Sequence, residues 1–237
     1  MKYTLVQQNG LILEKDGEAF RLTDYFCEHY GYAAFGGCIK VVYEEKDGAL
    51  ILCNCTQCGI KKEILLCSRK HTFQNREIRL EEWKDSLYLF FSAIYKQKKM
   101  ILVYRKTVPV RIFDACDAQP FQTLSLDDGI LVLYQKGGQW GYSILKEENI
   151  SPFQPIVATN PVKLFFHQTS IWLLCFENRY VLYNLSQNKS YPLPLVFYKK
   201  PFLTFLENAI EIRYRFQHKN IVYLLKDGEI NFLCEED

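Results

Sequence analysis

The sequence lacks the motifs that mark several large classes of enzyme. It contains no GxSxG, GxxxxGK[ST], GxGxxG or HExxH pattern, the spacings with which serine hydrolases, nucleotide-binding proteins, dinucleotide-binding proteins and zinc proteases build their sites. These absences favour a protein that is not an enzyme, and we expect no catalytic residue and no cofactor.

An excess of one charge is also missing. The 29 Lys and Arg residues are scattered among 27 Asp and Glu residues, which gives a formal net charge of +2. We therefore expect neither nucleic acid nor an anionic membrane as a partner.

No apolar run approaches the roughly 18 residues of a membrane span, and the N-terminus has no signal-peptide pattern. These features predict a cytoplasmic protein.

Methionine and proline are scarce, with 2 Met and 8 Pro, whereas there are 16 Tyr and 17 Phe. Aromatic and β-branched residues favour pleated sheets over helical bundles. Because 49% of the residues are hydrophobic, the chain can bury a full core. We predict an all-β protein and one domain over residues 1–237.

A weak internal repeat organises the strands. A small residue, usually after a short polar one, precedes an apolar strand at five places, and the spacings of these small residues are 49, 43, 41 and 39. The five are Gly37, Ser86, Gly129, Ser170 and Ala209. A second strand follows each opening strand after a polar turn such as 46–48 or 137–138, which indicates a hairpin. We expect the apolar opening strands to be the inner ones, with segments such as 78–80 and 121–124 forming outer strands of the preceding unit.

This arrangement resembles the β-propeller superfold, and it is closer to sialidase-like and lectin-like propellers than to WD-repeat ones. The resemblance implies a ring of about five four-stranded antiparallel blades. The last repeat, from residue 210, shows three strands, so we expect an N-terminal strand to complete it and remove an exposed edge. Alternatively, residues 9–13 begin a sixth blade. No WD ending and no aspartate box occur, so no sialidase catalytic residue can be transferred.

The residues that open the repeated strands are the main candidates for a ligand site. In a propeller these turns would ring a central funnel, and they place Asp85, Asp128, Thr169 and Asn208 around it, with Gly36 as a fifth, open position. Such a ring could bind a sugar, a cation or a basic peptide. The alternative is that these residues are there because they favour turns.

Two further side chains are candidates for ligand binding. Trp140 lies beside Gly137 and Gly138 and could form a platform on which a sugar ring stacks. His29 lies in a polar and aromatic segment before the first opening strand. Its alternative role is that of an ordinary packing residue.

Cysteines gather at Cys53, Cys55 and Cys58, with Cys67 further along. A Cys-x-x-Cys turn can hold zinc, but a structural site normally needs a second pair of ligands. We therefore predict no metal, and we keep a zinc-stabilised module with Cys55 and Cys58 as ligands as an alternative.

These observations lead to two hypotheses about function. The first is a non-enzymatic binding or scaffold module whose partner is another protein. The second is a carbohydrate-binding or glycoside-active propeller that uses the polar funnel. A glycosidase would need two carboxylates about 5 to 10 Å apart, and Asp85 with Asp128 is the pair that the repeat suggests.

Overall fold

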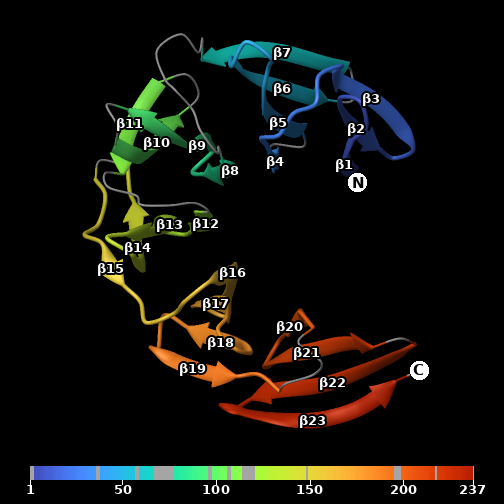
Figure 1. Ribbon diagram of the computed structural model, residues 1–237, viewed down its shortest axis with the longest axis vertical. Coiled ribbons are helices and arrows are strands. Elements are labelled where there is room, and N and C mark those ends of the chain that lie inside the picture. Colours follow the sequence, from blue (N-terminus) through green and yellow to red (C-terminus); the bar gives the residue numbers. More distant parts are fainter. Residues whose placement is uncertain are drawn as a thin grey trace. The chain divides into compact units, whose positions relative to one another are not determined.

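Antiparallel β-sheets make up the regular structure of the chain. The computed structural model describes residues 3–35, 38–56, 59–66, 77–95, 98–105, 108–113, 121–147, 149–194, 199–216 and 218–236. These residues form 23 strands in six antiparallel sheets (Figure 1), so the all-β prediction is confirmed. In this described part of the chain, no helix has the length and hydropathy to cross a membrane.

The chain divides into two compact units, Met1–Pro155 and Ile156–Asp237. The first unit holds one three-stranded and three four-stranded sheets. Their strands are β1 (Tyr3–Gln7), β2 (Leu11–Lys15) and β3 (Glu18–Thr23); β4 (Tyr30–Phe35), β5 (Cys38–Glu44), β6 (Leu50–Thr56) and β7 (Gly59–Leu66); β8 (Ile78–Trp83), β9 (Ser86–Tyr95), β10 (Lys98–Arg105) and β11 (Val108–Phe113); and β12 (Gln122–Leu126), β13 (Gly129–Lys136), β14 (Gln139–Leu145) and β15 (Gln154–Pro155).

The second unit holds two four-stranded sheets. Their strands are β16 (Pro161–His167), β17 (Ser170–Phe176), β18 (Tyr180–Asn184) and β19 (Lys189–Pro192), and β20 (Phe202–Leu206), β21 (Ala209–Phe216), β22 (Lys219–Lys226) and β23 (Glu229–Glu236). The grouping of residues 1–237 into one domain stays a prediction.

The repeated hairpins are present, but they occupy a different place in each sheet than expected. Each hairpin supplies the second and third strands, because a separate strand precedes it. β8 and β12, which were predicted to be outer strands of the preceding unit, instead begin the next sheet. Both segments were recognised as strands, but neither the alternation of buried and exposed residues in β8 nor the half-buried residues of β12 indicate which sheet the strand joins.

The last sheet likewise has four strands of its own. β20 precedes the predicted opening strand and pairs with β21 from Phe202 to Leu206. The expectation that this repeat has three strands, and so needs one from the N-terminus, was therefore wrong. The N-terminal strands pair with one another as β1-β2-β3.

Neighbouring sheets of the first unit meet at their first strands. β8 lies against both β4 and β12 (Figure 1). Gly31 of β4 comes so close to Ile78 of β8 that an added Cβ would lie 2.8 Å from the Ile78 carbonyl oxygen. This close approach explains why the position is occupied by glycine. On the other side, the Glu81 carboxylate accepts hydrogen bonds from Thr123 at 2.6 Å and Ser125 at 2.7 Å.

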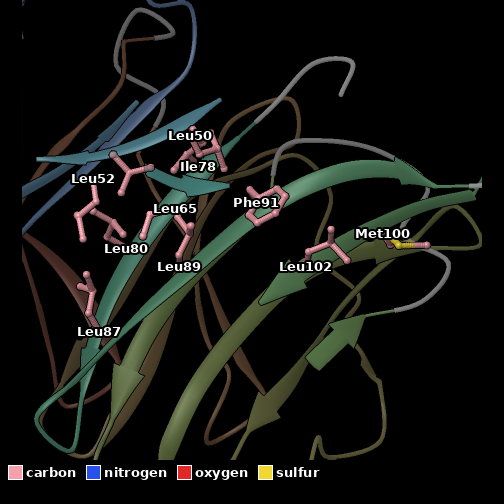
Figure 2. Packing of buried hydrophobic residues seen from close by; sticks show 11 residues of the cluster. Leu50, Leu52, Leu65, Ile78, Leu80, Leu87, Leu89, Phe91, Met100 and Leu102 are labelled. Atoms are coloured by element: carbon pink, nitrogen blue, oxygen red, sulfur yellow. The ribbon is translucent and has the colours of Figure 1, made fainter. Parts of the chain in front are cut away.

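Apolar side chains fill the spaces between these sheets. Figure 2 shows one cluster, in which Leu50 and Leu52 of β6 and Leu65 of β7 belong to the same core as Ile78 and Leu80 of β8. The two central strands of each four-stranded sheet are the most buried, and the first six residues of β13 are all buried. Full burial of a Leu or Ile side chain stabilises the fold by about 1.5 to 3 kcal/mol. Burial on both faces explains why these strands read as continuous apolar runs.

Candidate functional site

A polar hollow of about 590 Å³ lies between the two sheets of the second unit. One sheet lines it with the turns that follow β16 and β18, and the other lines it with the turns that follow β20 and β22. Its size falls within the range of cavities that take small molecules. All the residues that form it come from within the second unit.

The turn after β16 holds an unusual backbone conformation at the rim. His167 pairs with Ser170 across this two-residue turn, and Gln168 and Thr169 have φ values of 49° and 61°. Two successive positive φ values are the geometry of a type I′ hairpin, which matches the twist of the strands. A β-branched residue such as Thr169 rarely adopts such a φ, so this side chain is held at the rim at a cost in backbone strain.

The inner wall is partly aromatic and partly aliphatic. The rings of Trp172 and Tyr191 lie 5.8 Å apart with an interplanar angle of 37°, and both line the hollow. Ile210 and Leu225 line it from the other sheet and are buried. A ligand here would therefore meet an apolar surface beneath a polar rim.

Two buried nitrogen atoms of the wall have no hydrogen-bond partner within the described residues. They are Nε2 of His167 and Nε1 of Trp172. An unsatisfied buried polar group costs about 1 to 3 kcal/mol, and such groups in a folded protein call for an explanation. Both residues contribute to the lining of the hollow, while these two nitrogen atoms are themselves buried.

Charged and amide side chains complete the lining. Lys189 lies at the start of β19, Lys226 at the end of β22, and Asp227 in the following turn. Asn184 is buried, and its Oδ1 accepts a hydrogen bond from the backbone N–H of Gln187 at 3.0 Å. Cations and amides thus line the hollow from both sheets, and hydroxyls line it from the β16–β19 sheet.

The four predicted funnel residues occupy equivalent turns in four successive sheets. Each is the second residue of the two-residue turn between the first and second strands, as the pairs Trp83 with Ser86, Leu126 with Gly129, His167 with Ser170, and Leu206 with Ala209 establish. Each of these turns therefore joins the first strand of its sheet to the second. The apolar second strands were expected to be the inner strands, but in the first unit neighbouring sheets contact each other through their first strands.

The structure brings two of these four residues together. Thr169 and Asn208 both line the hollow. Asp85 and Asp128 belong to the first unit and are exposed. The Asp128 carboxylate forms an ion pair with Lys146 at 2.9 Å, whereas a catalytic acid is usually buried so that its pKa rises. The pairing of Asp85 with Asp128 at an active site stays a prediction.

The two other candidates belong to the first unit and do not line the hollow. Trp140 is half-buried in β14 and pairs with Gln135 of β13. His29 precedes β4, its Nε2 lies 3.7 Å from the Glu28 carboxylate, and its backbone carbonyl accepts a hydrogen bond from Glu44. Their roles in ligand binding stay predictions.

The cysteine cluster falls partly outside the described residues. Cys53 and Cys55 are buried in β6, and burial raises the pKa of the Cys53 thiol, which makes it less reactive. Cys58 and Cys67 lie outside the described part of the chain. Among the residues that are described, no three His, Cys, Asp or Glu side chains are placed to hold a metal ion.

Sequence reasoning missed most of the hollow. His167 is one of four histidines dispersed along the sequence, and Trp172 lies within a continuous apolar strand, so neither stands out. Lys189, Lys226 and Asp227 lie at strand ends and turns, where polar residues are ordinary. The feature of the sequence that did point to the hollow was the repeat, because it placed Thr169 and Asn208 in equivalent turns.

Sequence comparisons found no relative. No protein-family model matches the chain, and no curated protein matches it.

Solved structures do share its fold. A prolyl endopeptidase matches with a TM-score of 0.60 and 10% identity over 95% of this chain, which spans only 38% of the length of that one. A subtype N10 neuraminidase-like protein of the virus A/little yellow-shouldered bat/Guatemala/060/2010 matches with a TM-score of 0.52 and 7% identity, over 99% of this chain and 86% of its own. KlAtg21, solved in complex with the coiled-coil of AgAtg16, matches with a TM-score of 0.55 and 12% identity, over 86% of this chain and 69% of its own.

The fold defined by these sheets and likenesses is consistent with a β-propeller. At such low identity the likeness concerns the fold alone, and a propeller fold hosts both enzymes and binding modules.

Proposed function

We propose that this chain is a non-enzymatic binding module, and that the hollow of its second unit holds a carbohydrate. The observation that carries this proposal is the aromatic pair Trp172 and Tyr191 in the wall of a hollow that is otherwise lined by polar side chains. Sugars present many hydroxyl groups that can bond to polar side chains, and an aromatic face next to such side chains suits the two sides of a sugar ring.

The rim supports a sugar as the occupant. Thr169, Ser170 and Asn208 bring hydroxyl and amide groups to the edge of the hollow, and these groups both donate and accept hydrogen bonds. Trp172 and Tyr191 offer ring surface in the same space. No reaction is proposed, because the lining has one carboxylate, Asp227, and glycoside hydrolysis normally takes two.

A glycan array tests this proposal, with the chain compared in three forms. Asn208→Ala removes a lining amide, and Glu207→Ala alters the neighbouring exposed residue of the same turn, which does not line the hollow. We expect wild type and Glu207→Ala to bind the same glycans and Asn208→Ala to bind them more weakly. Absence of glycan binding by all three forms would refute the proposal.

Asp85 and Asp128 enter this proposal as an extension of the site. If the equivalent turns act together around one funnel, Asp128→Ala will also weaken glycan binding. If the hollow is sufficient by itself, binding by Asp128→Ala will match that of wild type.

A protein partner is the second candidate. Val108 and Ile112 are 59% and 53% exposed on β11, the last strand of its sheet, and exposed apolar side chains on an outer strand suit protein recognition. The coiled-coil held by KlAtg21 is a precedent on a similar fold. Affinity capture with wild type and with Val108→Asp/Ile112→Asp tests this role. A partner retained equally by both forms would argue against this surface.

We also propose that the sheets close into a ring of five or six blades. A closed, compact chain of this length has a radius of gyration of about 18 Å. Small-angle X-ray scattering that gives a clearly larger value would contradict closure.

A further inference from the structure

The hollow of the second unit has more hydrogen-bond donors than acceptors to offer. The Trp172 indole can only donate, and its Nε1 has no partner among the described residues. Lys189 and Lys226 bring ammonium groups, which also only donate. The Oδ1 of buried Asn184 is already engaged by the Gln187 backbone, so its amide nitrogen is the freer end of that side chain.

Two other lysines of the same unit have partners. Lys219 forms an ion pair with Glu235 at 2.7 Å, and Lys163 lies over the Phe165 ring. Neither Lys189 nor Lys226 has an ion pair within the part of the chain that the structure describes. They approach the hollow from different sheets, Lys189 from β19 and Lys226 from β22. With Asp227 as the carboxylate of the lining, the hollow carries a surplus of one positive charge.

We propose that the hollow selects sugars that carry a negatively charged group, and that Lys189 and Lys226 hold this group from opposite sheets. This inference rests on the carbohydrate-binding role proposed for the same hollow. The charged group accepts hydrogen bonds from the two ammonium groups, while Trp172 and Tyr191 contact the sugar ring. The Asp227 carboxylate repels a second negative charge on the ligand, so a sugar with one carboxylate binds better than a more highly charged sugar.

A matched pair of ligands tests this selection. Methyl β-D-glucopyranosiduronate and methyl β-D-glucopyranoside differ only at C6, where one has a carboxylate and the other a hydroxymethyl group. Hydrogen bonds to charged groups are about twice as strong as neutral ones, so we expect the uronate to bind about tenfold more tightly. Titration followed by nuclear magnetic resonance measures both affinities on the full chain. Added NaCl will weaken uronate binding and leave glucoside binding unchanged.

Charge-neutral variants identify the lysines responsible. Lys226→Gln and Lys189→Gln are exposed substitutions and should each reduce the preference for the uronate severalfold. Lys163→Gln is the matched control, because Lys163 is exposed on β16 and does not line the hollow. We expect it to keep the full preference.

The outcomes separate this inference from the proposed function. Equal binding of the two glycosides would overturn the selection of acidic sugars and leave carbohydrate binding intact. Sodium sulfate that competes as strongly as the uronate would show a simple anion site and overturn the inference. Binding of neither glycoside, together with a negative glycan array, would overturn both.

Discussion

The imidazole ring of His167 and the phenyl ring of Phe205 lie 4.8 Å apart, centroid to centroid. They come from β16 and β20, the first strands of two sheets. The Phe165 ring lies 5.0 Å from Phe205 as well, so one aromatic side chain of β20 braces the strand that carries His167. The wall of the hollow therefore depends on how these two sheets pack.

Phe205→Ala should reduce both stability and binding. Truncation of a fully buried Phe costs roughly 3 to 5 kcal/mol, and because Phe205 is half-buried we expect a loss of about 2 kcal/mol. Urea unfolding measures this change. Phe202→Ala on the same strand is the control, since Phe202 is 63% exposed and its truncation should change stability by less than about 0.5 kcal/mol. Similar losses for both would contradict the packing described.

Thr169→Asn should stabilise the protein. The φ of 61° costs a β-branched residue about 1 to 2 kcal/mol, whereas Asn tolerates this region. We expect the free energy of unfolding to rise by about 1 kcal/mol, measured by chemical denaturation. Thr159→Asn, in an exposed loop without a positive φ, should have little effect. A destabilised Thr169→Asn would show that the Thr169 side chain makes a stabilising contact.

Gly31→Ala should destabilise the first unit. A Cβ here would lie 2.8 Å from the carbonyl oxygen of Ile78, so β4 and β8 would have to separate. Overpacking of this kind costs about 1 to 3 kcal/mol. Ala34→Ser, at an exposed position of the same strand, should be neutral. Thermal unfolding of the two variants measures the difference, and equal midpoints would argue against the close approach of these strands.

Glu77 should make stability depend on pH. Burial raises the pKa of its carboxyl group, while Arg79 and the Phe121 backbone N–H act in the opposite direction. Because the pKa is higher in the folded than in the unfolded chain, the folded protein binds the proton more tightly. The free energy of unfolding therefore falls as pH rises from about 4.3, the ordinary value for Glu, through the raised pKa.

Urea unfolding at several pH values measures this effect for wild type and Glu77→Gln. The difference between the two should vary with pH in that interval. Glu82→Gln, at an exposed position on β8, provides the control and should follow wild type. Parallel curves for wild type and Glu77→Gln would contradict a raised pKa.

The sequence predicted the strands that are buried on both faces. β13 and β17 were recognisable because continuous apolar runs end at turn residues. First strands such as β12 were assigned to the wrong sheet, because half-buried residues give neither a clear apolar run nor a strict alternation. The grouping of strands into sheets depends on pairing, which the pattern along the chain does not specify.

The site was predictable only where it coincided with the repeat. Thr169 and Asn208 were found because their turns are equivalent, although they were expected to ring a funnel with Asp85 and Asp128. His167 and Trp172 could not be recognised, since only the packing of two sheets shows that they line one hollow. Lys189 and Lys226 are far apart in sequence, and the packing of two sheets brings them to one hollow.

The most direct test of the binding role follows the indole N–H signals of Trp83, Trp140 and Trp172 by nuclear magnetic resonance during titration with methyl β-D-glucopyranosiduronate. Trp172→Phe assigns the signal of interest. We predict that the Trp172 signal shifts and saturates while those of Trp83 and Trp140 stay in place, because of the three only Trp172 lines the hollow that holds the ligand. An unmoved Trp172 signal at saturating ligand, or equal shifts of all three, would contradict the account.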